Sequence, residues 1–196
     1  MTGSPCATHR PADNPFASHR VEGLAFRSPG PAVAELASRV ESLGGRVAIV
    51  GPEGSGKTTL LRQLAHVLPG ESVDVGIPGG CPDPWRTARA QLPRSLSREH
   101  AVLVDGAEQL GPVAWRRFLG ATRPAGCLVV TLHRPGRLPT LIECRTDHEL
   151  LRDLVRELAP AAAPSLDFAH LFRRHDGNIR LCLRELYDVY AGRAAG

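Results

Sequence analysis

Lysine is almost absent from this chain: 23 of its 24 basic side chains are arginine, and Lys57 is the only lysine. Either residue places a positive charge on a solvated surface equally well. The two differ in a tight space, because lysine is a slim point charge on a flexible stem and arginine is a broad planar fork. A single retained lysine therefore indicates a slot too narrow for a guanidinium group.

Three further absences restrict the class of protein. No apolar run approaches the roughly 20 residues of a membrane span, and the first 16 residues lack the apolar core of a signal peptide. No CxxC spacing is present, and the number of cysteines is odd, which argues against both zinc sites and disulfides. These features predict a cytoplasmic protein with reduced thiols and no membrane span. The cysteines are Cys6, Cys81, Cys127, Cys144 and Cys182.

The composition is that of a soluble globular protein, with 42% hydrophobic residues in 196. This length predicts one domain, with room for a small appendage. A net charge of +4 and a pI near 9.1 permit a nucleic-acid partner without demanding one.

Short continuous apolar runs alternate with helical patterns through the middle of the chain, which predicts βαβ units. Runs of this kind are typical of buried parallel strands. The expected strands are 46–50, 72–75, 101–105, 127–132 and 140–144, and the expected helices are 31–45, 59–68, 84–92 and 113–121. The fold class predicted is α/β, a three-layer P-loop NTPase sandwich with a mostly parallel five-stranded sheet.

The ends of the chain differ from this middle part. Residues 1–30 are rich in Pro, Ser and His and predict an irregular arm, followed by the α/β domain over 31–146. From Asp147 the strands stop and three helical stretches follow, which predicts a small all-helical lid over 147–196.

The segment GPEGSGKTT, residues 51–59, fits the phosphate-loop (Walker A) pattern between an expected strand and an expected helix. Its glycines let successive backbone N–H groups point at phosphate oxygens, and the helix adds its positive end. Lys57 would reach the β- and γ-phosphates, which explains why it is retained. The residues predicted to bind nucleotide are Gly51, Pro52, Glu53, Gly54, Ser55, Gly56, Lys57, Thr58 and Thr59.

Acidic and polar side chains follow the next apolar strands. In AVLVDGAEQL (Walker B), Asp105 would hold Mg²⁺ together with the hydroxyl of Thr58. Glu108 lies where a carboxylate could orient and deprotonate the attacking water. Thr131 and His133 in VVTLHR are candidates for sensing the γ-phosphate.

These features together resemble AAA+ ATPases, and HDGNIRLCLRELYDVYAG resembles their sensor-2 element. The resemblance implies that Arg180 reaches the bound nucleotide from the start of a helix. The stretch NPFASHRVEGLAF is similar to the opening of helper ATPases of bacterial secretion and transposition systems. That similarity implies that Phe16 and Val21 lie beside the adenine.

Two stretches depart from that family. Gly106 follows the metal-binding Asp105, where AAA+ proteins usually carry a second acidic residue, and this resembles the signal-transduction NTPases instead. HRPGRLPTLIEC resembles the segment that supplies arginine fingers, without the usual intervening helix, so Arg134 and Arg137 are the finger candidates. A finger adds about 10³–10⁵ in rate, so an isolated subunit is expected to hydrolyse slowly.

The absence of two motifs narrows the alternatives. With one lysine in the P-loop the chain has no guanine-reading Asn/Thr-Lys-x-Asp motif, so ATP is expected rather than GTP. No Leu-Ser-Gly-Gly-Gln stretch precedes the acidic strand, which argues against an ABC cassette.

The function predicted is a Mg²⁺-dependent ATP hydrolase coupled to a protein partner or to assembly with copies of itself. One alternative is a small-molecule kinase with Asp74 as base and Arg134 and Arg137 as a phosphate lid. Another is a regulator that binds ATP without hydrolysing it, or a DNA-associated helper. Two basic stripes would serve that helper: Arg86, Arg89, Arg94 and Arg98 in one, and Arg116 and Arg117 in the other.

Overall fold

The computed structural model describes residues 13–27, 30–161 and 163–194. The chain divides into two compact units. One unit comprises residues 25–145, and the other joins the chain up to residue 24 to the segment from residue 146 onward. None of the helices in the described ranges has both the length and the apolar character that a membrane span requires.

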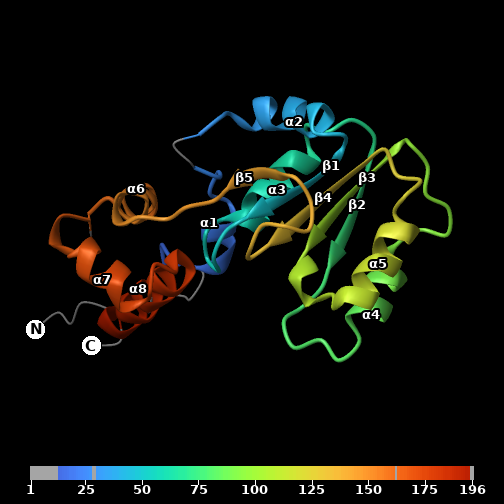
Figure 1. Cartoon of the computed structure of the whole chain (residues 1–196). Helices are drawn as coiled ribbons and strands as arrows, with labels where there is room; N and C mark the ends of the chain where they lie inside the picture. The colour runs from blue at the N-terminus through green and yellow to red at the C-terminus, as the bar shows by residue number, and fades with distance from the viewer. Residues whose placement is uncertain (1–12, 28–29, 162, 195–196) are drawn as a thin grey trace, which may run out of the picture. The chain divides into compact units, whose positions relative to one another are not determined.

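The unit of residues 25–145 is built on a five-stranded sheet (Figure 1). The strands are β1 (Arg46–Val50), β2 (Glu71–Gly76), β3 (His100–Asp105), β4 (Cys127–Leu132) and β5 (Thr140–Glu143). Their order is β2-β3-β4-β1-β5, and every pairing is parallel. The predicted α/β class with a parallel five-stranded sheet is confirmed, and each predicted strand is present.

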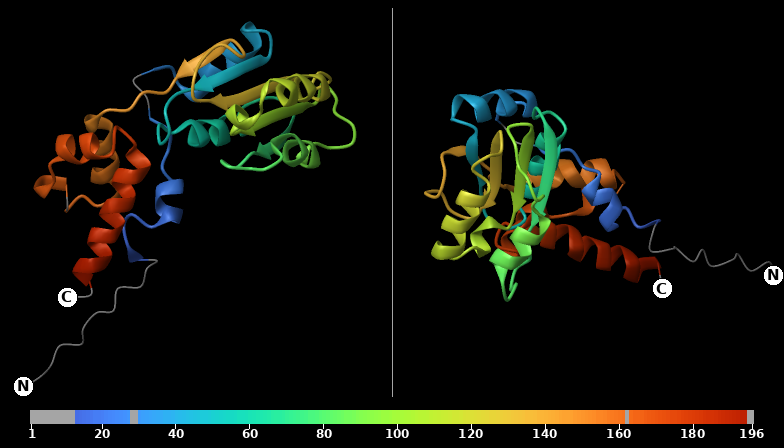
Figure 2. Two further views of the ribbon diagram at one scale, coloured as in Figure 1. Left: turned by 60° about the horizontal axis from the view of Figure 1, so that its bottom comes forward. Right: turned by 90° about the vertical axis from the view of Figure 1, so that its right-hand side faces the viewer.

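Helices cover both faces of this sheet, which gives the three predicted layers (Figure 2). Val47 and Ile49 of β1 pack with α2 (Val33–Ser42) and α3 (Lys57–Ala65). Ala48 and Val50 face the other way, toward α4 (Pro84–Gln91) and α5 (Pro112–Ala121). Successive side chains of a strand point to opposite faces, so a continuous apolar run is what a sheet buried on both faces requires.

The carboxyl ends of β1, β3 and β4 meet at one edge of the sheet. Gly51 N–H donates to the carbonyl of Leu132 over 3.1 Å, which joins the end of β1 to the end of β4. In the register of the sheet, Val50 pairs with Leu132 and Val104 pairs with Val130. The loops that carry the predicted site residues therefore leave the sheet side by side.

The second unit is helical, with α1 (Ser18–Glu22), α6 (His148–Leu158), η3 (Ala163–Ser165), α7 (Phe168–Arg174) and α8 (Ile179–Ala194). Asp147 and Asp167 cap the first turns of α6 and α7, where each carboxylate accepts a backbone N–H three residues later. The amphipathic face of α6 buries four side chains, and α7 and α8 pack against it.

The segment after residue 13 belongs to the core of this helical unit. Phe16, which the resemblance placed beside the adenine, is buried in this core. Its ring is edge-on to the ring of Tyr190, with 5.5 Å between the ring centroids. Asn14 donates its side-chain amide to the carbonyl of Tyr187 over 2.9 Å. Helix α1 was not predicted, and residues 1–12 and 28–29 of the expected arm lie outside the described residues.

Candidate nucleotide-binding site

The loop between β1 and α3 has a backbone that only glycine adopts without strain. Gly54 and Gly56 have φ angles of 74° and 84°, in the left-handed region. A Cβ atom on Gly51 would lie 2.6 Å from the carbonyl oxygen of Cys144 and 2.7 Å from the hydroxyl of Ser55. The three glycines of the motif therefore shape the loop, and α3 begins directly after it at Lys57.

Lys57 is buried in this loop, with 8% of its surface exposed. Its ammonium donates to the carbonyls of Gly51 and Pro52 over 2.8 and 2.7 Å. Burial lowers the pKa of Lys57, and the nearby carboxylates of Glu108 and Asp105 oppose that shift. The ammonium of Lys57 thus lies between two carbonyls, and the exclusion of a guanidinium from this slot stays a prediction.

Asp105, at the carboxyl end of β3, lies between two threonine hydroxyls. Thr58 donates to its Oδ2 over 2.9 Å, and Thr131 donates to its Oδ1 over 2.9 Å. Thr131 is 1% exposed, and its hydroxyl also accepts the backbone N–H of Gly106 over 2.9 Å. The structure thus places Asp105 beside the loop from β1 and fixes its carboxylate through the neighbouring strand β4.

Glu108 lies on η2 (Ala107–Gln109), a short helix that the sequence did not predict. Its Oε1 is 3.2 Å from Nε2 of His133, which follows β4. Its Oε2 is buried and has no hydrogen-bond partner among the described residues. The two sequence candidates therefore form a pair, and one carboxylate oxygen of that pair is left unsatisfied.

Gly106 sets the direction in which Glu108 leaves β3. Its φ is 85°, and a Cβ atom there would lie 2.1 Å from the carbonyl oxygen of Ile77. A second acidic residue at this position, as in the AAA+ pattern, has no space in this backbone. The departure from that pattern thus has a steric cause.

The arginine candidates occupy three different settings. Arg137 donates to the carbonyl of Ala107 over 3.0 Å and lies over the ring of Trp115 at 5.3 Å, so it holds η2 against α5. Arg134 is exposed in the connection between β4 and β5. Arg180 is exposed in the first turn of α8 and belongs to the helical unit.

The remaining loop residues have simpler positions. Pro52 and Glu53 are exposed, Thr59 is half-buried in the first turn of α3, and the Ser55 hydroxyl donates to the carbonyl of Pro52 over 2.7 Å. Phe26 was not predicted as a residue of this loop, and its ring lies 3.2 Å from where a Cβ of Gly56 would stand. An aromatic residue in the segment before α2 is a weak sequence signal, and only the packing shows its position.

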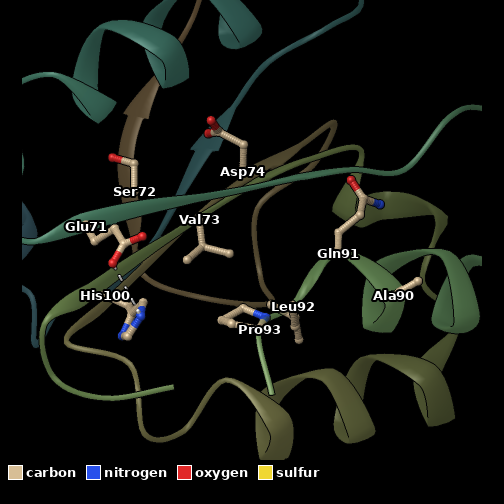
Figure 3. A pocket seen from close by; sticks show the side chains of 9 residues that line it. All are labelled: Glu71, Ser72, Val73, Asp74, Ala90, Gln91, Leu92, Pro93 and His100. Atoms are coloured by element: carbon tan, nitrogen blue, oxygen red, sulfur yellow. Dashed lines mark ion pairs between the residues drawn. The ribbon is translucent and has the colours of Figure 1, made fainter. Parts of the chain in front are cut away.

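A separate hollow of about 450 Å³ lies at the outer edge of the sheet, along β2 and the end of α4 (Figure 3). It contains Asp74, the base of the kinase alternative, and no residue of the phosphate loop. Within the described ranges, no three His, Cys, Asp or Glu side chains gather as a metal site. The residues lining the hollow are Glu71, Ser72, Val73, Asp74, Ala90, Gln91, Leu92, Pro93 and His100.

No family model matches the sequence, but curated proteins align with parts of it. The phosphonates import ATP-binding protein PhnC of Polaromonas sp. is 33% identical over 136 residues, which are 69% of this chain and 43% of that protein. The hemin import ATP-binding protein HmuV of Enterobacter cloacae is 34% identical over 85 residues, 43% of this chain and 30% of that protein. The phosphate import ATP-binding protein PstB 2 of Natronomonas pharaonis is 39% identical over 71 residues, 36% of this chain and 24% of that protein. The chain therefore spans less than half the length of these relatives.

These relatives are ATP-binding subunits of ABC transporters, which are P-loop NTPases. The absence of a Leu-Ser-Gly-Gly-Gln stretch argued against an ABC cassette, yet these similar proteins are ABC transporter subunits. The resemblance to AAA+ helper ATPases is not confirmed by the matches. The chain thus has the architecture of a P-loop NTPase, and over part of its length it is similar to ATP-binding subunits that belong to the same class of fold.

Proposed function

We propose that this chain binds ATP with Mg²⁺, hydrolyses it, and transmits the change to a partner protein or to another copy of itself. One observation carries the proposal: Lys57, Thr58, Asp105 and Thr131 come from three different segments and converge at one edge of the sheet. The location proposed is cytoplasmic. Both the AAA+ resemblance and the import relatives support a protein whose ATP use serves a partner.

The residues present fit a triphosphate with its magnesium. Mg²⁺ prefers oxygen ligands and usually binds through one or two protein groups together with substrate phosphates. Asp105 and Thr58 provide such oxygens 2.9 Å apart. The left-handed glycines give the loop the curl that directs backbone N–H groups inward. A site of this kind needs no cluster of three acidic side chains.

Lys57 would exchange its two carbonyl contacts for phosphate oxygens when nucleotide binds. The carbonyls of Gly51 and Pro52 hold the ammonium in position in the meantime, so little reorganisation is needed. We expect that the broad, planar guanidinium of an arginine does not fit this slot, whereas the slim ammonium of Lys57 does. Bound Mg²⁺ would neutralise part of the negative charge at the transferred phosphoryl group.

Glu108 would accept the proton of the attacking water at Oε2, which has no partner among the described residues and would have to become accessible to that water from its buried position. His133 holds the other oxygen, Oε1, and so orients the carboxylate. A general base positioned in this way typically contributes about 10²–10⁴ in rate. Arg134 is proposed to add charge at the phosphates as a finger toward another copy, and a role of Arg180 at the nucleotide stays a prediction from the sequence. Arg137 could act as a finger only after leaving Ala107 and Trp115.

Calorimetric titration of MgATP into the purified chain tests the binding step. We expect heat of binding for the wild type and none for Lys57→Arg, although the charge is kept. Lys57→Ala is the matched loss-of-charge variant, and tryptophan fluorescence verifies the fold of each. Unchanged affinity in Lys57→Arg would show that the slot argument is wrong.

Phosphate release separates binding from hydrolysis. Glu108→Gln should bind MgATP like the wild type and lose about 10²–10⁴ in turnover, because the amide cannot accept the proton. His133→Gln should lower kcat with little change in KM, since it acts only through Glu108. Release of phosphate without any acceptor distinguishes a hydrolase from a kinase. Undiminished turnover in Glu108→Gln would place the base elsewhere.

A further inference from the structure

The helical layer formed by α4 and α5 carries arginine and no acidic residue. Residues 84–98 and 109–126 contain seven arginines and neither Asp nor Glu. Every one of the seven side chains is exposed. They are Arg86, Arg89, Arg94, Arg98, Arg116, Arg117 and Arg123.

The two helices present these charges on their outward sides. On α5, Trp115 and Phe118 are buried against the sheet, so Arg116 and Arg117 lie on the opposite, solvent side of the helix. On α4, Ala88 faces the sheet, and Arg86 and Arg89 are exposed. The helices pack on each other over the same face of the sheet (Figure 1). Their two stripes therefore form one surface.

The connections after the helices extend this surface. Arg94 and Arg98 follow α4, and Arg123 follows α5. The two connections run side by side, because Gly126 N–H donates to the carbonyl of His100 over 2.9 Å. A Cβ on Gly126 would also lie 2.1 Å from the carbonyl oxygen of Arg98. We call the surface formed by the seven arginines the arginine face.

Within the described ranges, none of the seven arginines of this face forms an ion pair with a carboxylate. Arg145, Arg152, Arg156 and Arg174, by contrast, do form ion pairs. The whole chain carries 24 basic and 20 acidic side chains, so the rest of the chain, with 17 basic side chains, has a net charge of −3. The overall charge of +4 is thus the sum of +7 on the arginine face and −3 on the rest of the chain.

We propose that the arginine face binds the phosphate backbone of a nucleic acid. A stripe of unpaired basic side chains on one face is the electrostatic footprint of such binding. Helix α5, with ten residues, is about 15 Å long. Along that length one DNA strand presents about four phosphates, because its phosphates are spaced by about 3.4 Å along the axis of the duplex. Contacts of this kind position the protein without reading the sequence.

The apolar content of the face argues against a membrane or an obligate protein interface. Among the described residues of the α4–α5 layer, Val113 is the only large hydrophobic side chain that is strongly exposed, at 64%. Insertion into a bilayer interface needs an apolar face, and the centre of a protein interface is depleted of charge. A phosphate polymer needs neither.

Fluorescence anisotropy with a labelled 30-base-pair duplex and a 30-nucleotide single strand, between 50 and 300 mM salt, tests the proposal. We expect binding that weakens with salt, with a slope of about −0.9 per phosphate contacted on duplex DNA. Arg116→Glu/Arg117→Glu should make the slope less steep by about 2. At 0.1 M salt, counterion release is worth about eightfold per contact, so this variant should bind at least about 60-fold more weakly.

Two further variants make the result specific. Arg86→Glu/Arg89→Glu, on the other helix, should weaken binding similarly. Arg39→Glu/Arg184→Glu changes the charge by the same amount at exposed positions on α2 and α8, and should bind like the wild type apart from a small general effect. Tryptophan fluorescence checks that each variant is folded.

The outcomes separate this proposal from the ATPase proposal. The assay is run without nucleotide, and Lys57→Ala should bind nucleic acid normally, while Arg116→Glu/Arg117→Glu should bind MgATP normally. The proposal is overturned if the wild type binds neither nucleic acid at 50 mM salt, or if the two face variants bind as well as the control. It is also overturned if the wild type binds vesicles with 30% anionic lipid and no nucleic acid.

Discussion

Replacing Thr131 by valine tests how the site is held together. The hydroxyl of Thr131 donates to Oδ1 of Asp105 and accepts the N–H of Gly106, both over 2.9 Å. Valine keeps the branched shape and removes the hydroxyl, so a carboxylate oxygen and a backbone N–H lose their partner. A hydrogen bond to a charged group contributes about 1.5–3 kcal/mol and a neutral one about 0.5–1.5. Thr131→Val should therefore lower the free energy of unfolding by about 2–4 kcal/mol.

Thr131→Ser is the matched control, because it keeps the hydroxyl and removes one buried methyl group. Its expected cost is about 1 kcal/mol. Urea unfolding followed by tryptophan fluorescence is the appropriate assay. Both tryptophans of the chain, Trp85 and Trp115, lie in the unit of residues 25–145, so the signal reports the sheet and not the helical unit.

We expect a fixed order of stability for the two Thr131 variants. The serine variant must be more stable than the valine variant, and it should keep more of the MgATP affinity, since Asp105 stays oriented. A valine variant within about 0.5 kcal/mol of the wild type, or a serine variant that loses as much as valine, would refute the structural role assigned to this hydroxyl.

Three other outcomes are expected. Gly106→Ala should destabilise the sheet unit by several kcal/mol in the same urea assay, because its φ is 85° and the new Cβ would collide with the carbonyl of Ile77. Gly111→Ala is the control and should be near neutral, because a Cβ at Gly111 has open space around it. Burial raises the pKa of Cys144 from 9.0 to about 11, so its thiol stabilises the native state below pH 9 and that contribution is lost as the pH rises toward 11. Cys144→Ala should therefore lose about 2–3 kcal/mol less than the wild type over this range, and equal losses would contradict the assignment. If Arg134 acts as a finger between copies, mixing Arg134→Ala with Lys57→Ala should restore part of the ATPase activity that each lacks alone, and no recovery would remove that role.

Much of the sheet unit was predictable because its signals are local. Each predicted strand is present within one or two residues, since a brief apolar run between turn residues satisfies a strand buried on both faces. The phosphate loop was likewise predictable from consecutive residues, because its curl depends on glycines that tolerate left-handed φ angles. Predicted helix 59–68 begins earlier, at Lys57, since the loop ends at Gly56 and the helix starts directly after it.

Other features depend on residues that are distant in the sequence. The core position of Phe16 was not predictable, because its partner Tyr190 lies at the other end of the chain. The short helix with Glu108 was missed because three residues show no periodicity. Arg137 was an arginine-finger candidate from its sequence context, and only packing shows its contacts with Ala107 and Trp115.

The sequence by itself determined the fold class and the glycine pattern of the phosphate loop, because each is encoded by neighbouring residues and their backbone preferences. Tertiary structure alone decided that β4 lies between β3 and β1, which brings Thr131 to Asp105 and His133 to Glu108. It also decided that α4 and α5 share one layer, which gathers their arginines. Strand order and helix pairing follow from how apolar faces are buried across the whole unit. The periodicity within a single segment cannot predict them, because it depends only on neighbouring residues.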